Sequence, residues 1–540
     1  MRFVVSAAAV LVVLALMAPA VMADPPFLDC GPAQSVCRAW PVAGQNIADT
    51  HSQPAEHKIN TGNVAGLQTR WTFTALPSVT SSASSDISAT PTVAKNVVYF
   101  PDWGGHLYAV NAQTGKTIWA RKISEYDGVA GAYSRTSPAI VGDLLILGDK
   151  PPSGINGWPS GQGAHIFAVN ARTGNLVWNT KVDDTFVSQI TGSVVTFRGV
   201  AYAGISSIEE VTATKPGYVC CIFRGSVAAL DVGTGQILWK TFDMPPGYSG
   251  GAIWGSTAAV DPGLGLLYVG TGNNYSVPAG VTTVSPDDHF DSLLALDLKT
   301  GKIRWATGTI QFDNWTVACF GQTTPQPNCP NPSSPDADFG SGPNLFTAGR
   351  TTLVGAGTKG GTYWALDAAT GKIAWATQVG PGGIFGGIEW GSSVADGHVY
   401  VAEANSAQAD FPLDHPSPGT TLTSSKGAGV WEALDAATGK ILWQTPDPAG
   451  KTFGAIGQVA SANGVVYAGS TDRQGHVYAL DGNTGQIKWS FATGGSIASG
   501  ASIVNGVVYW GSGYSQFAAF GTTGNNKVFA FSLPGEGDDD

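Results

Sequence analysis

Two carboxylates one residue apart, Asp336 and Asp338, stand in a polar loop that runs to the rigid pair Gly342-Pro343. A carboxylate can take a proton from a substrate and can also bind a metal ion, so this pair could supply a general base and a metal ligand. The same Asp-x-Asp spacing also occurs in ordinary calcium-binding turns. The loop is therefore a candidate catalytic segment.

A second candidate, Asn273, follows an apolar strand-like run and stands in Gly270-Thr271-Gly272-Asn273-Asn274. An amide oxygen at the end of a strand suits a hard cation such as calcium, although Asn is also common in ordinary turns. The glycine-rich run does not lead into a helical pattern, which excludes the dinucleotide-binding fingerprint.

Trp254 is flanked by glycines in Gly250-Gly251-Ala252-Ile253-Trp254-Gly255-Ser256. Glycines allow a flat ligand to approach closely, and an indole face is a good stacking surface. The alternative is a tryptophan that only packs between structural elements.

One further polar loop contains Glu209, Glu210, the adjacent pair Cys220 and Cys221, and Arg224. Two neighbouring carboxylates and an arginine beside adjacent cysteines are more than a structural loop needs. A solvated acidic loop is the alternative, because Glu and Arg are mostly exposed in folded proteins.

The elements that must position these residues come from a repeat of the form Ala-Leu-Asp-x-x-Thr-Gly-Lys-x-x-Trp. The repeat ends at seven tryptophans: Trp119, Trp178, Trp239, Trp305, Trp375, Trp443 and Trp489. Each copy has an alternating apolar run, a turn in which Gly supplies positive φ, and a short return run, which predicts a hairpin. Two more strand-like runs precede each hairpin, so the unit is a four-stranded propeller blade. The repeated Trp is expected to pack between neighbouring blades.

The two ends of the repeat region complete the ring. Leu67–Phe73 resembles the second half of a hairpin, and Val528–Leu533 resembles the first half. Pairing them would close eight blades and leave no open edge. Successive tryptophans are mostly 59 to 70 residues apart, whereas a blade needs about 40–50 residues. The excess must lie in loops, where function is usually carried.

The expected organisation is a signal peptide over residues 1–23, an N-terminal arm over 24–60, the propeller over 61–535 and an acidic tail over 536–540. The first segment has one Arg, a long apolar stretch and a small-residue end, as secretory signals do. No later stretch is long and apolar enough to cross a membrane, and the net charge of −11 argues against nucleic acid as a partner. A periplasmic or secreted location is predicted.

Six cysteines in an exported chain predict three disulfides, and local pairing gives Cys30–Cys37, Cys220–Cys221 and Cys319–Cys329. The chain has no Cys-x-x-Cys-His motif for attached haem and no His-Glu-x-x-His motif for zinc.

Taken together in chain order, these motifs resemble the quinoprotein alcohol dehydrogenases, and most closely their polyvinyl-alcohol dehydrogenase branch. The resemblance covers nearly the whole mature chain. It implies an eight-bladed all-β propeller that binds pyrroloquinoline quinone (PQQ) and Ca²⁺, oxidises an alcohol by hydride transfer, and passes the electrons to an external acceptor such as soluble cytochrome c.

The resemblance also implies roles for individual residues. Trp254 would stack on the quinone, Lys359 would approach its oxygens, and Arg135 would pair with a cofactor carboxylate. Calcium would be held by Glu209, Asn273 and Asp336. Asp336 would be the base, and Asp338 is the second candidate for that role. Cys220, Cys221 and Arg224 would complete the cofactor site.

Three departures from the family pattern stand out. The adjacent cysteines lie in the third blade rather than earlier, the usual Trp-Asp-x-Asp segment is divided between Trp315-Thr316 and Asp336-Ala337-Asp338, and the haem domain of some relatives is not found. Two other functions stay open: a non-catalytic propeller scaffold of the cell envelope, and an aldose dehydrogenase with the same cofactor. Against the scaffold stand the extra polar loops and the lack of a lipid-anchor cysteine.

Overall fold

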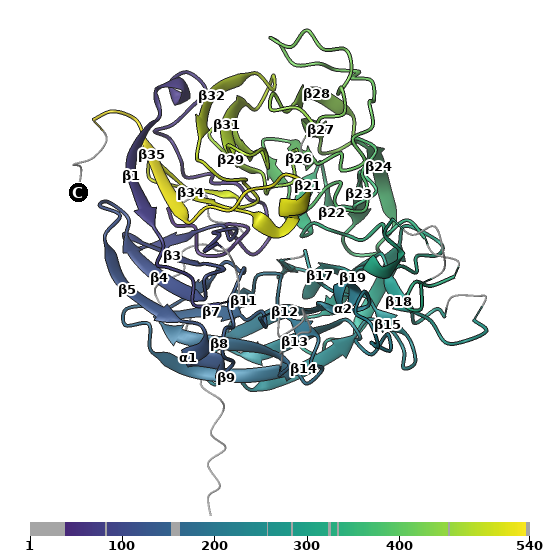
Figure 1. Cartoon of the computed structure of the whole chain (residues 1–540). Helices are drawn as coiled ribbons and strands as arrows, with labels where there is room; N and C mark the ends of the chain where they lie inside the picture. The colour runs from purple at the N-terminus through teal and green to yellow at the C-terminus, as the bar shows by residue number, and fades with distance from the viewer. Residues whose placement is uncertain are drawn as a thin grey trace, which may run out of the picture.

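The repeat folds as expected, into eight antiparallel sheets arranged around a central axis (Figure 1). The computed structural model describes residues 38–80, 84–152, 162–255, 257–281, 285–321, 326–331, 334–451 and 454–535. The predicted signal peptide, the Cys30–Cys37 pair and the acidic tail lie outside these residues.

The strands of each blade follow one another in the sequence. The first four blades contain β2 (Thr92–Ala94), β3 (Val97–Pro101), β4 (His106–Asn111) and β5 (Thr117–Lys122); β6 (Ala139–Val141), β7 (Leu144–Gly148), β8 (Ala164–Asn170) and β9 (Leu176–Asp183); β10 (Ser188–Gln189), β11 (Val195–Phe197), β12 (Val200–Ser207), β13 (Ser226–Asp231) and β14 (Ile237–Phe242); and β16 (Ala259–Asp261), β17 (Leu266–Gly270), β19 (Ser292–Asp297) and β20 (Ile303–Gly308). A separate two-stranded sheet pairs β15 (Ser249–Gly250), which precedes the fourth blade, with β18 (Asn274–Ser276), which lies between β17 and β19 in the sequence.

The other four blades repeat this order until the ring closes. They contain β21 (Asn344–Ala348), β22 (Thr351–Gly357), β23 (Thr362–Asp367) and β24 (Ile373–Gln378); β25 (Ser393–Ala395), β26 (His398–Glu403), β27 (Val430–Asp435) and β28 (Ile441–Pro446); β29 (Ala460–Ala462), β30 (Val465–Gly469), β31 (His476–Asp481) and β32 (Ile487–Ala492); and β33 (Ala501–Val504), β34 (Val507–Ser512), β35 (Lys527–Ser532) and β1 (Gln68–Thr74). The predicted terminal pairing is confirmed, because β1 pairs antiparallel with β35, with Thr72 opposite Phe529.

The repeated tryptophans join neighbouring blades, as predicted. Each indole Nε1 donates a hydrogen bond to a backbone carbonyl of the next blade, at 2.8–3.2 Å. Trp71 of β1 makes the same contact with Ala112, so the series runs around the whole ring. A turn glycine of the following hairpin faces all of these rings except Trp489: a Cβ on Gly485, at φ +73°, would lie 2.4 Å from Trp443. The motif therefore encodes both a turn and a joint between blades.

The N-terminal arm crosses the inner edges of the blades. First strands of most neighbouring blades contact one another around the axis, and residues 40–53 hydrogen-bond through their main chain to six of them. The partners are Val93, Ile140, Val260, Leu345, Val394 and Ser461. Trp40 at the start of this run is fully buried. The arm thus covers strand edges that would otherwise present unpaired amide groups.

The remaining elements are short helices in the long loops: η1 (Val64–Gly66), α1 (Ser124–Asp127), α2 (Glu209–Thr212), η3 (Val317–Cys319) and η4 (Ser515–Phe520). In Figure 1 the yellow η4 lies close to the middle of the ring. The disulfides Cys220–Cys221 and Cys319–Cys329 are both formed, as predicted. Within the described residues no helix is long and apolar enough to cross a membrane.

Candidate functional site

Two positions of the blade supply the polar residues of the site. Glu209, Asn273 and Lys359 follow the second strands β12, β17 and β22, while Trp254 and Asp336 precede the first strands β16 and β21. The second strand of each blade runs in the same direction relative to the axis of the ring, so the loops at these strand ends meet on one face of the ring. The repeat alone therefore gathers loops from the third, fourth and fifth blades.

The centre of the site is the ammonium group of Lys359 between two carboxylates. Its Nζ lies 2.8 Å from Asp336 Oδ1 and 2.9 Å from Asp338 Oδ2, and all three side chains are buried. Burial opposes the charge on Lys359, but the two carboxylates outweigh it and raise the pKa of the ammonium well above its usual range. Lys359 is therefore a fixed cation.

Asp336 and Asp338 differ in the hydrogen bonds that their carboxylate oxygens accept. Burial raises the pKa of Asp336 well above its usual range, and Asp338 and Glu210 add to this while Lys359 opposes it. Its Oδ2 has no hydrogen-bond partner, and its backbone is left-handed, with φ +63°. In Asp338, by contrast, Oδ2 accepts from Trp254 Nε1 at 2.8 Å and Oδ1 from the amide of Asn273 at 2.7 Å. Only Asp336 retains a carboxylate oxygen without a donor.

Trp254 lies beneath this group. Its ring is 5.1 Å from Lys359 Nζ and meets Trp390 edge to face, with centroids 5.2 Å apart. The guanidinium of Arg135 covers the other indole, 4.0 Å from the centroid of Trp390. Aromatic faces thus extend from Lys359 to Arg135.

The side chain of Asn273 is oriented by its amide nitrogen. Nδ2 donates to the carbonyls of Trp315, at 2.9 Å, and Asn274, at 3.0 Å. This fixes Oδ1 as the end that can accept or ligate. Asn273 is buried, and its backbone amide donates to Asp338 Oδ1.

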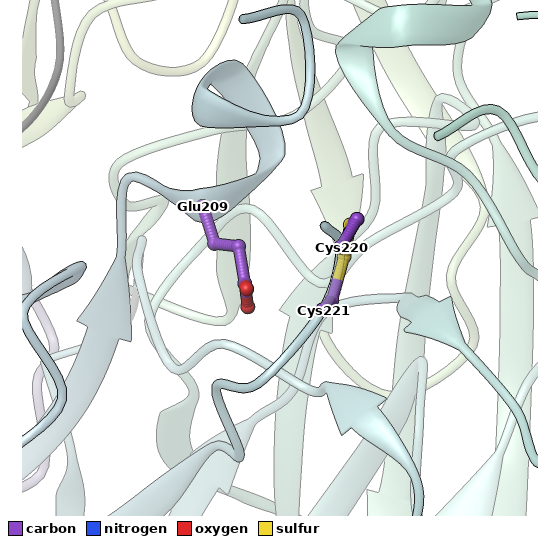
Figure 2. Close-up of side chains that lie close together, drawn as sticks. All are labelled: Glu209, Cys220 and Cys221. Carbon is purple, nitrogen blue, oxygen red and sulfur yellow. A yellow bond between two sulfur atoms is a disulfide. The ribbon is translucent and has the colours of Figure 1, made fainter. Parts of the chain in front are cut away.

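Glu209 and its neighbour Glu210 face different surroundings. Glu209 lies beside the Cys220–Cys221 disulfide (Figure 2) and accepts hydrogen bonds from the Tyr218 hydroxyl and from the amides of Ile222 and Phe223. Both of its oxygens are therefore engaged in holding the disulfide loop. The two sulfurs are bonded to each other, so they are not the thiolates that bind metals.

Glu210 is directed to the Lys359 group instead. Burial raises the pKa of Glu210 to about 8; Lys359 opposes this shift, and Asp338 and Asp313 add to it. Its Oε1 is buried without a hydrogen-bond partner. Glu210 therefore interacts electrostatically with the Lys359 group and has an oxygen that accepts no hydrogen bond.

Arg224 lies apart from this group. Its guanidinium donates to the Met244 carbonyl and covers the ring of Phe242, 4.2 Å from the centroid. Asp243 is its charged neighbour. The described contacts thus bring together Trp254, Lys359, Asp336, Asp338 and Asn273, with Arg135 further along, whereas Arg224 is turned toward the end of β14.

Three acidic residues and one Trp join the site without having been singled out from the sequence. Asp313 accepts from the amides of Asp336 and Ala337 and so holds this candidate segment in place. Asp291 is buried with both oxygens unpaired, and burial raises the pKa of Glu389 to about 8. The Trp is Trp390, and the sequence contained a signal for it: Gly386-Gly387-Ile388-Glu389-Trp390-Gly391-Ser392 repeats the spacing around Trp254.

Two family models match the chain. The one described as outer membrane protein assembly factor BamB matches residues 68–214 and 291–529. The one described as the glucose/ethanol/alcohol dehydrogenase β-propeller domain matches residues 224–328, which include Trp254 and Asn273. The first covers most of the blade repeat, and the second covers much of the loop region that builds the site.

Individual relatives point the same way. A polyvinylalcohol dehydrogenase of Sphingopyxis sp. (strain 113P3) is 34% identical over 82% of this chain and 70% of its own length. A second polyvinylalcohol dehydrogenase, of Pseudomonas sp., is 30% identical over 92% of this chain and 77% of its own length. The solved quinohemoprotein alcohol dehydrogenase of Comamonas testosteroni covers 93% of this chain and 81% of its own, with a TM-score of 0.65 at 19% identity, so the fold is shared.

Proposed function

The chain belongs to the alcohol dehydrogenases that depend on PQQ, and from that premise we propose that it oxidises secondary alcohol groups, including those of polyvinyl alcohol. The observation that carries the proposal is the buried group of Trp254, Lys359 and Asp336. There a flat aromatic face, a fixed cation and an unpaired carboxylate oxygen meet.

The residues fit the quinone and a divalent cation. An indole face suits a flat ring system, and Lys359 offers a cation for a quinone oxygen. For calcium we propose Glu210 and Asn273 Oδ1 as oxygen ligands, with Glu210 in place of Glu209, because both oxygens of Glu209 already accept hydrogen bonds. Asp336 is assigned the base role instead, because Lys359 holds its Oδ1. When bound, the quinone supplies a two-electron acceptor and the cation supplies Lewis acidity.

Asp336 is the proposed general base. Lys359 holds its Oδ1, which leaves Oδ2 to accept the proton of the substrate hydroxyl. Asp338 is a positioning residue: its bonds to Trp254 and Asn273 fix the indole and the calcium ligand relative to each other. Asp313 fixes the segment that carries both carboxylates. Holding base and acceptor in one geometry removes much of the entropic cost of the reaction.

The electrons would pass to a soluble cytochrome c; a related protein carries that acceptor in its name, the lupanine 17-hydroxylase [cytochrome c] of Pseudomonas sp.. Export to the periplasm or the medium is proposed from the predicted signal peptide and the two disulfides.

One experiment tests the function directly. Purified protein is loaded with PQQ and Ca²⁺, and dye reduction is followed with primary alcohols, secondary alcohols, polyvinyl alcohol and aldoses. We expect turnover on secondary alcohols and polyvinyl alcohol. Turnover on aldoses alone would make the chain an aldose dehydrogenase, and absence of both quinone binding and turnover would remove the proposal.

A further inference from the structure

Lys150 is a buried cation without an acidic partner. Only 6% of its surface is exposed, and among the described residues no carboxylate lies within 4.0 Å of its Nζ. The neighbouring Asp149 is engaged elsewhere, because its oxygens accept from the backbone amide and contact the ring of His165. The ammonium instead faces the ring of Tyr133, at 5.8 Å from the centroid.

A second cation makes this arrangement less favourable for the empty protein. Burial, and then the charge of Arg135, lower the pKa of Lys150 to about 7. The backbone of Lys150 is fixed by two hydrogen bonds to Tyr133, two residues before Arg135. Local backbone pairing thus holds the buried Lys150 near the partly buried Arg135, where the protonated form of Lys150 is disfavoured unless an anion is bound beside it.

The position of Arg135 and Lys150 relative to the Lys359 group indicates which anion they would bind. Arg135 covers Trp390, Trp390 meets Trp254, and Trp254 lies below Lys359. Side-chain contacts therefore lead from the acidic Lys359 group, through two indole rings set edge to face, to Arg135 beside Lys150. A flat ring system with redox oxygens on one side and carboxylates on the other would match both ends.

We propose that Lys150, together with Arg135, binds a carboxylate of the quinone cofactor. The inference rests on the proposed function, since it assumes that the quinone lies against these indole rings. It assigns Lys150 a binding role that the sequence did not suggest. Binding a carboxylate provides the counter-charge that Lys150 lacks among the described residues.

The test measures cofactor affinity rather than turnover. PQQ is titrated into wild type, Lys150→Met and Lys150→Arg, and the Kd is obtained from quenching of tryptophan fluorescence. We expect Lys150→Met to weaken binding at least tenfold and Lys150→Arg to restore most of the loss. The exposed Lys116→Met, in the β4–β5 turn, is the matched control and should leave Kd unchanged.

A second ligand separates charge recognition from packing. The trimethyl ester of PQQ has no free carboxylates, so wild type and Lys150→Met should bind it with equal Kd. Melting of the cofactor-free variants gives an independent reading, because removal of an unpaired buried cation should leave Tm unchanged or raise it. A Lys150→Met protein that binds PQQ within twofold of wild type would overturn the inference, as would an equal loss toward the ester. Failure of wild type to bind PQQ at all would instead overturn the proposed function, and this inference with it.

Discussion

Polar groups are hydrogen-bonded at the joints between blades, whereas several buried polar groups in the loops of the site have no partner. At each joint the Trp indole has a carbonyl acceptor, and in the repeated turns the Asp or Asn accepts from the Thr three residues on. In the site, by contrast, Asp336, Asp291 and Glu210 keep buried oxygens without partners. The joints are built for stability, whereas the site holds unsatisfied charge that a metal ion and a substrate could use.

The largest expected effect comes from the unpaired oxygen of Asp336. Asp336→Asn should lower kcat by about 10³-fold or more, as expected for loss of a general base, while PQQ binding stays within a few-fold of wild type. Dye reduction and fluorescence titration measure the two. Asp338→Asn should cost less in kcat and more in cofactor affinity, since it positions Trp254 and Asn273. The reverse order would make Asp338 the base.

A substitution that disrupts a joint between blades should cause a large loss of stability without a direct effect on catalysis. Gly485→Ala places a methyl group 2.4 Å from Trp443 at φ +73°, so the free energy of unfolding should fall by about 3 kcal/mol or more. Gly349→Ala is the matched control: it also has positive φ, at +63°, but no atom lies within 4 Å of the added methyl. Its cost should be about 1–2 kcal/mol. Equal losses of unfolding free energy would show that backbone strain at positive φ, and not the contact with Trp443, causes the destabilisation.

The charges of the site should appear in the pH dependence of the metal-free protein. Burial raises the pKa of Glu210 to about 8 from an ordinary value of 4.5, so the folded state binds the extra proton. Its stabilising contribution is complete below pH 4.5 and is lost as the pH rises to 8, at up to about 1.4 kcal/mol per pH unit. Denaturant unfolding should show a shallower decline in Glu210→Gln. Calcium should stabilise wild type most at pH 8; if it stabilises Glu210→Gln equally, Glu210 is not a ligand.

A milder change at the same joint should have the smallest effect. Trp443→Phe keeps most of the apolar surface but removes the 2.8 Å hydrogen bond to Gly482. We expect a loss of about 1–3 kcal/mol, because the Gly482 carbonyl loses its donor. Thermal melting measures it, and kcat of the loaded enzyme should match wild type. A fall in kcat without a fall in Tm would show that joints and site are coupled.

Much of the fold could be predicted because its information is local and repeated. The Asp-x-x-Thr-Gly turn fixes a hairpin through side-chain hydrogen bonds and a positive-φ glycine, and the same turn recurs in blade after blade. Closure through β1 and β35 followed from two unmatched half-hairpins. The pairing of Cys220 with Cys221 and of Cys319 with Cys329 followed from proximity in the chain.

The site was harder to predict because its residues come from loops with little repeat. Trp254 could be singled out since it falls outside the hairpin pattern, and the same reasoning applied to Gly386–Ser392 would have found Trp390. Arg224 stands beside the disulfide in the sequence, but its guanidinium turns to Met244. Lys150 has no sequence signal, because its significance is that no carboxylate of the described residues contacts its side chain, although Asp149 precedes it in the chain.

The sequence by itself determined the ring, the joints and the segments that carry the chemistry. Only the tertiary structure showed that Glu209 and Glu210 lie in different surroundings. Successive side chains in a helical turn point about 100° apart, so neighbouring carboxylates face different surroundings. Which one faces the disulfide loop and which one faces Lys359 depends on how α2 packs against loops from other blades. That packing is set by contacts across long sequence separations, which the local sequence does not contain.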